Sequence, residues 1–124
     1  MMRKHRILTI GMVMLGAALP GEASAHPHLQ SANPAPDAIV STPPQEVRVA
    51  FSEVIEPSLS AIQIVGATGP VATAGKAFVD HVAPETLVVK LSQPLPPGDY
   101  EARWRCVGMD SHVMRGSYHF EVRP

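Results

Sequence analysis

Prolines spread along the chain limit its fold more than any other feature of the sequence. There are 13 prolines among 124 residues, and many gather in short clusters such as Pro34-Ala35-Pro36 and Pro94-Leu95-Pro96-Pro97. Proline breaks helices and cannot donate to the hydrogen-bond ladder of a central strand. The segments between the clusters are short and rich in β-branched residues, which is typical of strands. The sequence therefore predicts an all-β domain with frequent turns.

Apolar and polar residues alternate in several of these segments, as expected of half-buried strands. The pattern is clearest from Asp99 to Val107, where Trp104 is expected to anchor the core and Tyr100 resembles the tyrosine corner of immunoglobulin-like domains. Shorter strands are expected at residues 29–33, 47–51, 60–65, 78–82, 86–91 and 117–122, and residues 66–75 are expected to form a loop or a weak edge hairpin. About seven strands at roughly ten-residue spacing predict a Greek-key β-sandwich or barrel of immunoglobulin-like, cupredoxin-resembling type.

The first 25 residues have the layout of a secretory signal peptide. The basic segment Arg3-Lys4-His5-Arg6 precedes an apolar run of 13 residues from Ile7 to Leu19, and small residues ending in Ala23-Ser24-Ala25 follow. A membrane-spanning helix needs about 20 apolar residues, and this run is shorter and ends at Pro20-Gly21. Cleavage after Ala25 is predicted. The exported, periplasmic protein would then begin at His26, with one domain over residues 26–124.

The composition of residues 26–124 narrows the possible functions. Seven Lys/Arg and ten Asp/Glu give this part a net charge of −3 with neutral histidines, whereas a nucleic-acid-binding protein would carry a basic stripe. Cys106 is the one cysteine, so packing rather than an internal disulfide must stabilise the fold. Cys106 itself is expected to be a small buried core residue.

A histidine at the amino terminus would offer a metal ion two nitrogens from one residue. The α-amine and ring Nδ1 of His26 can close a six-membered chelate, and a reference pKa of about 7.7–8.0 lets a divalent metal displace the amine proton near neutral pH. Asp110 and His112 lie two residues apart, so in extended backbone they would project to the same side. Together the three residues supply three nitrogens and one oxygen, a set that suits tetragonal Cu(II).

The same residues also have simpler explanations. A signal peptidase leaves whichever residue follows its cut, so His26 alone is weak evidence for a ligand. An Asp-x-His triplet also occurs in ordinary polar turns, where Asp110 would cap its own backbone and His112 would face solvent. Surface or rim positions, without an assigned metal contact, are expected for His28, His81, His119, Met109 and Met114.

Several segments of residues 26–124 follow one another in the order found in a known family. They are His26-Pro27-His28-Leu29, Val49-Ala50-Phe51-Ser52-Glu53, Gly98-Asp99-Tyr100 with Trp104-Arg105, Asp110-Ser111-His112, and Gly116-Ser117-Tyr118-His119-Phe120-Glu121-Val122. In these segments the chain resembles the CopC/PcoC family of periplasmic copper-binding proteins. The resemblance implies a Cu(II) site at His26, Asp110 and His112. Glu53 would lie near the metal, as a weak axial ligand or as a neighbour of the ligands.

The resemblance also implies a function. Such a protein binds one Cu(II) per chain for storage, buffering or delivery in copper homeostasis and resistance, and its implied partner is a CopD-like inner-membrane copper transport protein. Some family members carry a second, Cu(I) site on a methionine-rich loop, because soft thioethers select Cu(I). Residues 66–81 of this chain contain no methionine, so a Cu(I) site is not expected here.

Two rival functions stay open at the level of sequence. A histidine-brace copper oxidase or monooxygenase also uses an amino-terminal histidine. It needs an open coordination position, which Asp110 would fill, and a broad substrate face, for which a small domain has little room. A metal-free immunoglobulin-like interaction module would bind no copper at all. The sequence favours the copper-binding protein, which is not an enzyme.

Overall fold

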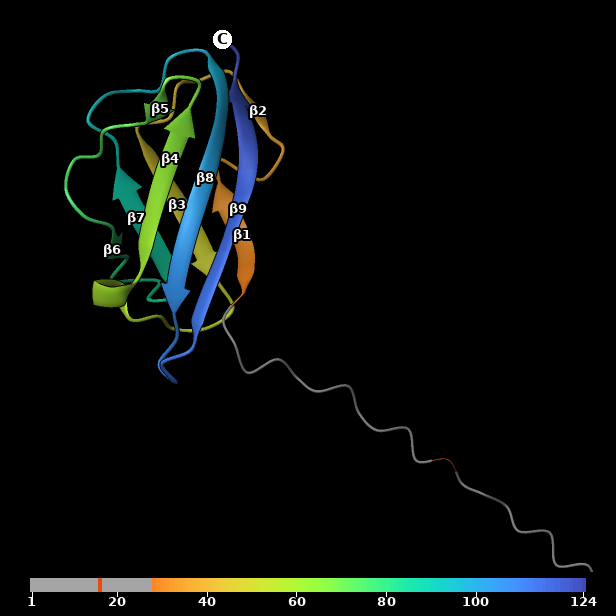
Figure 1. The fold of residues 1–124 in the computed structure, drawn as a ribbon, viewed down its shortest axis with the longest axis vertical. Coiled ribbons are helices and arrows are strands. Elements are labelled where there is room, and N and C mark those ends of the chain that lie inside the picture. The colour runs from red at the N-terminus through yellow and green to blue at the C-terminus, as the bar shows by residue number, and fades with distance from the viewer. Residues whose placement is uncertain (1–15, 17–27) are drawn as a thin grey trace, which may run out of the picture.

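The computed structural model describes Gly16 and residues 28–124, and the latter form two β-sheets packed face to face (Figure 1). The four-stranded sheet has the order β1 (Leu29–Asn33), β3 (Glu46–Phe51), β7 (Thr86–Lys90), β6 (Phe78–Val79). The five-stranded sheet has the order β2 (Ile39–Val40), β9 (Val113–Val122), β8 (Gly98–Val107), β4 (Ala61–Gly66), β5 (Gly69–Pro70). A 3₁₀ turn, η1 (Pro57–Leu59), precedes β4. No helix in residues 28–124 is long and apolar enough to cross a membrane.

The predicted all-β Greek-key sandwich is confirmed, but the expected number of strands is too low. Both additional strands, β2 and β5, are only two residues long, so neither has a readable alternation. The strand β2 pairs in parallel with the end of β9, and β5 closes a hairpin with β4. The last strand also begins earlier than expected, at Val113 instead of residue 117.

Alternate residues of the facing strands fill the space between the sheets, as the sequence predicts. Val47, Val49 and Phe51 of β3 are fully buried, and the apolar positions of β4 and β8 pack against them. The hydroxyl of Tyr100 donates a 2.6 Å hydrogen bond to the carbonyl oxygen of Pro96. This bond, from the entry of β8 back to the preceding turn, is the expected tyrosine corner.

The indole ring of Trp104 joins the two sheets. It meets Phe51 edge-on, with ring centroids 5.1 Å apart and an interplanar angle of 67°, a favourable geometry for an aromatic pair. Gly116 lies directly opposite Trp104 on β9. A Cβ atom at Gly116 would come within 2.3 Å of Cζ2 of the indole. The half-buried ring therefore lies flat over a position that only glycine leaves open.

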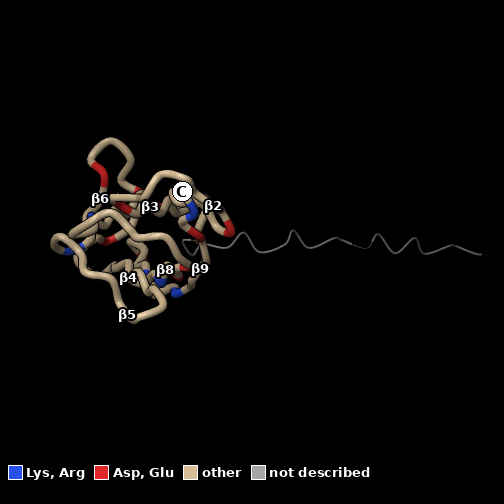
Figure 2. Tube along the Cα trace, turned by 90° about the horizontal axis from the view of Figure 1, so that it is seen from above, with Lys and Arg blue, Asp and Glu red and all other residues tan. Residues whose placement is uncertain are grey.

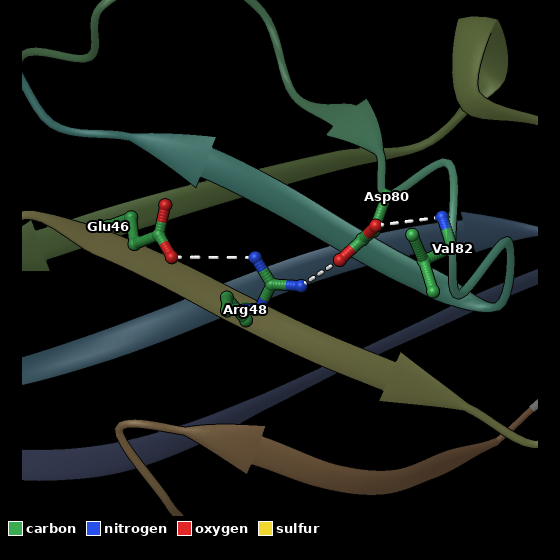
Figure 3. Close-up of polar contacts among 4 residues, drawn as sticks. All are labelled: Glu46, Arg48, Asp80 and Val82. Carbon is green, nitrogen blue, oxygen red and sulfur yellow. Dashed lines mark hydrogen bonds and ion pairs between the residues drawn. The ribbon is translucent and has the colours of Figure 1, made fainter.

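A charged cluster fastens the loop after β6 to the outer face of the four-stranded sheet (Figure 3). Arg48 donates to Asp80, and its other amino group lies 3.4 Å from a carboxylate oxygen of Glu46. The backbone N–H of Val82 donates to Asp80 over 2.9 Å. This N–H bond and the Arg48 guanidinium lower the pKa of the Asp80 carboxyl. The cluster holds the chain reversal between β6 and β7 in place.

We expect Gly116→Ala to lower the free energy of unfolding by about 1–3 kcal/mol, because the added methyl group overlaps the Trp104 ring and pushes it off Phe51. Urea denaturation followed by indole fluorescence measures the change. The matched control is Ser117→Ala, the next and exposed position on β9, which should shift stability by less than about 0.5 kcal/mol. Equal stability of Gly116→Ala and the wild type would contradict the tight contact.

Candidate metal centre

The connection between β8 and β9 is a tight hairpin loop. The N–H of Ser111 donates to the carbonyl of Gly108 over 3.0 Å, and the N–H of Gly108 donates to the carbonyl of His112 over 3.2 Å. The bond between Gly108 and His112 encloses a three-residue loop, residues 109–111. Its last residue, Ser111, has a φ of 69° and is left-handed, as is common in hairpins with loops of this length. The expectation of extended backbone from Asp110 to His112 is therefore wrong.

The loop nevertheless brings the side chains of Asp110 and His112 together. One carboxylate oxygen of Asp110 accepts the backbone N–H of His112 over 3.1 Å, and the other lies 2.8 Å from ring Nδ1 of His112. The first contact is the backbone cap of an ordinary polar turn. The second is additional to such a turn, and it fixes the direction of the imidazole.

This contact has a chemical consequence for the histidine. A carboxylate that accepts a hydrogen bond from Nδ1–H favours the tautomer whose lone pair is on Nε2, and it also makes that nitrogen a better metal donor. The Asp110 carboxylate is also a hard ligand in its own right, but Nε2 points away from it, so to share one ion with Nε2 it must first release Nδ1. The side chains of His112 and Asp110 are 62% and 37% exposed, so a metal ion from solvent can reach them.

The entry to β1 lies at the same end of the sandwich as this hairpin loop (Figure 1). The N–H of His28 donates to the hydroxyl of Ser52 over 3.0 Å, and the N–H of Ser52 donates to the carbonyl of His28 over 2.8 Å. These two bonds fix His28, the residue directly before β1, to the segment that follows β3. The predicted ligand His26 lies outside the described residues, so its role stays a prediction.

Ser52 lies near this end and has a role that its sequence context did not reveal. Its hydroxyl accepts the N–H of His28, a bond that its backbone alone could not supply. The available signal was a small hydroxyl residue directly after a strongly alternating strand, a position that often binds a neighbouring backbone group. The donor, the N–H of His28, could be named only once the pairing of β1 with β3 was known.

Glu53 is exposed. It lies on the segment that contacts both the entry to β1 and the base of the hairpin loop. Ser52, just before it, forms hydrogen bonds with His28, while Ile55, two residues after it, forms an isolated bridge with Gly108 at the base of the hairpin loop. Burial raises the pKa of the Cys106 thiol to about 11, and the nearby charge of Glu53 adds to the effect. A thiol with so high a pKa is a poor metal ligand near neutral pH, and Cys106 is fully buried as predicted.

The other histidines and methionines lie where the sequence predicts. His28, His81 and His119 are exposed. Met109 is 68% exposed on the hairpin loop, while Met114 is half-buried opposite Cys106. Within residues 28–124, no group of three or more His, Cys, Asp or Glu side chains could hold a metal ion by itself.

A cavity of about 1120 Å³ lies near this end of β8 but on its β4 side, since Ala61, which pairs with Arg105, is among the lining residues. It opens between the edges of the two sheets, and its apolar lining includes Ile62, Phe78 and Val79. None of Glu53, Asp110 and His112 lines it. The candidate metal centre is thus a surface site rather than a pocket.

Comparison with known proteins identifies the family. The model of the CopC domain matches residues 29–123, so the chain belongs to the CopC family, as its resemblance to that family predicted. Copper resistance protein C of Escherichia coli is 33% identical over an alignment of 124 positions. The alignment covers 94% of this chain and 94% of that one.

Solved structures agree with the sequence comparison. CopC from Methylosinus trichosporium OB3b superposes with a TM-score of 0.72 at 30% identity, covering 80% of this chain and 95% of that one. PcoC, a methionine-rich copper resistance protein from Escherichia coli, gives 0.71 at 31% identity, covering 80% and 100%. Both matches have the two-sheet fold described above.

Proposed function

We propose that this protein is a periplasmic copper-binding protein that holds one Cu(II) ion at the β8–β9 end of the sandwich and stores, buffers or delivers it. The observation that carries the proposal is the contact between Asp110 and His112 on a loop at the same end as the entry to β1. Membership of the CopC family and the copper resistance relative in Escherichia coli support the choice of metal.

The proposed ligands are the α-amine and ring of His26, the ring of His112 and the carboxylate of Asp110. Two residues of chain span at most about 7 Å, so His26 cannot be far from His28 and its anchor on Ser52. Three nitrogens and one oxygen suit the tetragonal geometry of Cu(II), which also has the highest affinity in the divalent series. Glu53 is proposed to lie beside this set, as a weak axial ligand or a hydrogen-bond acceptor.

The proposal requires export and processing. Only cleavage after Ala25 gives His26 a free α-amine, and the periplasm is the compartment to which such a signal peptide directs a protein. The proposed partner is a CopD-like copper transport protein of the inner membrane. Binding and transfer, rather than catalysis, fit a site in which Asp110 fills a coordination position that an oxidase would keep open.

We expect His112→Ala and Asp110→Ala both to weaken Cu(II) binding while the fold is retained, the histidine change more strongly, because imidazole is the better copper ligand. Titration against a chromophoric Cu(II) chelator measures the affinity, and circular dichroism checks the fold. His119→Ala removes an exposed histidine from the middle of β9 and is the matched control, with unchanged affinity expected. Wild-type affinity in both test variants would rule out the hairpin loop as the site.

We expect one extra residue ahead of His26 to weaken Cu(II) binding by at least about two orders of magnitude, because the amine becomes a neutral amide and the chelate is lost. A loss of about 1.4 kcal/mol is tenfold in affinity, and a metal–nitrogen bond is worth more than that. The comparison is between a chain beginning at His26 and one beginning Met-His26, by competition titration and electron paramagnetic resonance.

The two forms have the same side chains, so their thermal stabilities without metal should be nearly equal. That equality is the control for the fold. If both forms bind Cu(II) with the same affinity, the amine is not a ligand, and His28, His81 and His119 become the alternatives to test.

A further inference from the structure

Two arginines near the candidate metal centre differ from the other arginines of the described chain. Residues 28–124 contain five arginines, and three of them form ion pairs with carboxylates: Arg48, Arg103 and Arg123. Arg105 and Arg115 are exposed and have no ion pair or hydrogen bond with any described residue. They are also directly opposite each other on β8 and β9.

This arrangement costs stability. Directly opposite residues of an antiparallel pair lie on one face with Cβ atoms about 4.5–5.5 Å apart, and like charges there repel. The neighbouring positions do not relieve the repulsion, because Arg105 faces Ala61 on β4 and the nearest carboxylate on β8, Glu101, is bonded to Arg103. Figure 2 shows basic residues gathered on β8 and β9. An unrelieved pair of this kind indicates a surface shaped by binding.

The pair borders the candidate metal centre. Arg105 lies three residues before Gly108 and Arg115 three residues after His112, so the hairpin loop with both predicted ligands connects them. Between them Met109 and Val113 are 68% and 42% exposed. We call the surface of Arg105, Met109, Val113 and Arg115 the rim face. Its mixture of exposed apolar side chains with arginine is typical of protein interfaces.

We propose that the rim face docks a carboxylate-bearing segment of the protein that exchanges copper with this chain; the inference rests on the proposed function. Guanidinium groups match carboxylates with two parallel hydrogen bonds. The part of the chain that follows the predicted cleavage site has a net charge of −3, so its overall charge repels an acidic partner while the two arginines of the rim face attract it. Such a distribution orients the partner toward the copper end.

An anionic membrane is the less suitable partner. Recognition of acidic lipids typically uses clusters of about four to eight Lys or Arg, whereas the rim face has two. Asp110 also adds a negative charge beside it. The face of a two-stranded hairpin that carries two arginines at directly opposite positions fits discrete carboxylates better than a diffuse charged surface.

Titration with an octaglutamate peptide tests the proposal. The domain beginning at His26 is labelled with ¹⁵N, and amide shifts and affinity are measured at low and at physiological ionic strength. The test variant is Arg105→Gln with Arg115→Gln. The control variant, Lys76→Gln with Arg123→Gln, removes the same charge from positions outside the rim face. Vesicles of phosphatidylcholine with phosphatidylglycerol form a second arm, and Cu(II) affinity is measured on every form.

We expect peptide-induced shifts at residues 103–117, at least tenfold weaker peptide binding in the test variant, and less than threefold change in the control. Relief of the repulsion should leave the test variant at least as stable as the wild type. Equal weakening in both variants, shifts elsewhere, no peptide binding, or binding to vesicles alone would overturn the proposal. Because Cu(II) affinity should stay within threefold in the test variant, failure of the copper site itself is seen separately.

Discussion

The edge-on contact between Phe51 and Trp104 is the interaction on which the candidate metal centre depends. Phe51 ends β3 and leads directly into Ser52, while Trp104 belongs to β8, the strand that enters the hairpin loop. The contact therefore fixes the distance between the two sheets close to where both parts of the site emerge. Gly116 makes it possible, since any side chain there would occupy the space of the indole.

Backbone bonds carry this alignment outward to the surface. Ser52 holds His28 through two hydrogen bonds, and the bridge between Ile55 and Gly108 links the same segment to the hairpin loop. The donor side chains themselves remain exposed on a rigid support. Exposed side chains on a rigid support are accessible to a second protein, which agrees with the proposed storage and delivery of copper and with the proposed docking surface beside Asp110 and His112.

Much of this fold could be predicted because its main strands have one buried and one exposed face. The alternation along β3 and β8 gave the correct strands and the correct inward residues, and the tyrosine corner at Tyr100 followed from its position at a strand entry. The two-residue strand β2 could not be predicted, because pairing with a long neighbour, not its own sequence, defines it. The strand β5 forms the weak edge hairpin that was one of two expectations for residues 66–75. The early start of β9 was missed because glycine is uncommon inside a strand, whereas the Trp104 ring requires Gly116 within β9.

That Asp110 and His112 lie close together could be predicted from the sequence, but their local geometry could not, and their role as metal ligands stays a prediction. Asp110 and His112 do lie together, yet through a hairpin loop with Ser111 in the left-handed region, where serine is less common than glycine or asparagine. The anchor between Ser52 and His28 depends on which strands are neighbours, information that a local pattern does not contain. The role of His26 is still a prediction from the sequence, supported by the position of His28.

X-ray diffraction at the copper absorption edge tests the central claim most directly. Crystals of the domain beginning at His26, grown with one equivalent of Cu(II), should give a single anomalous peak per chain at the β8–β9 end. The account expects bonds from that ion to the amine and ring of His26 and to the ring of His112, with a carboxylate oxygen of Asp110 alongside. A peak at His81 or His119, or an ion at the hairpin loop without any bond to His26, would contradict it.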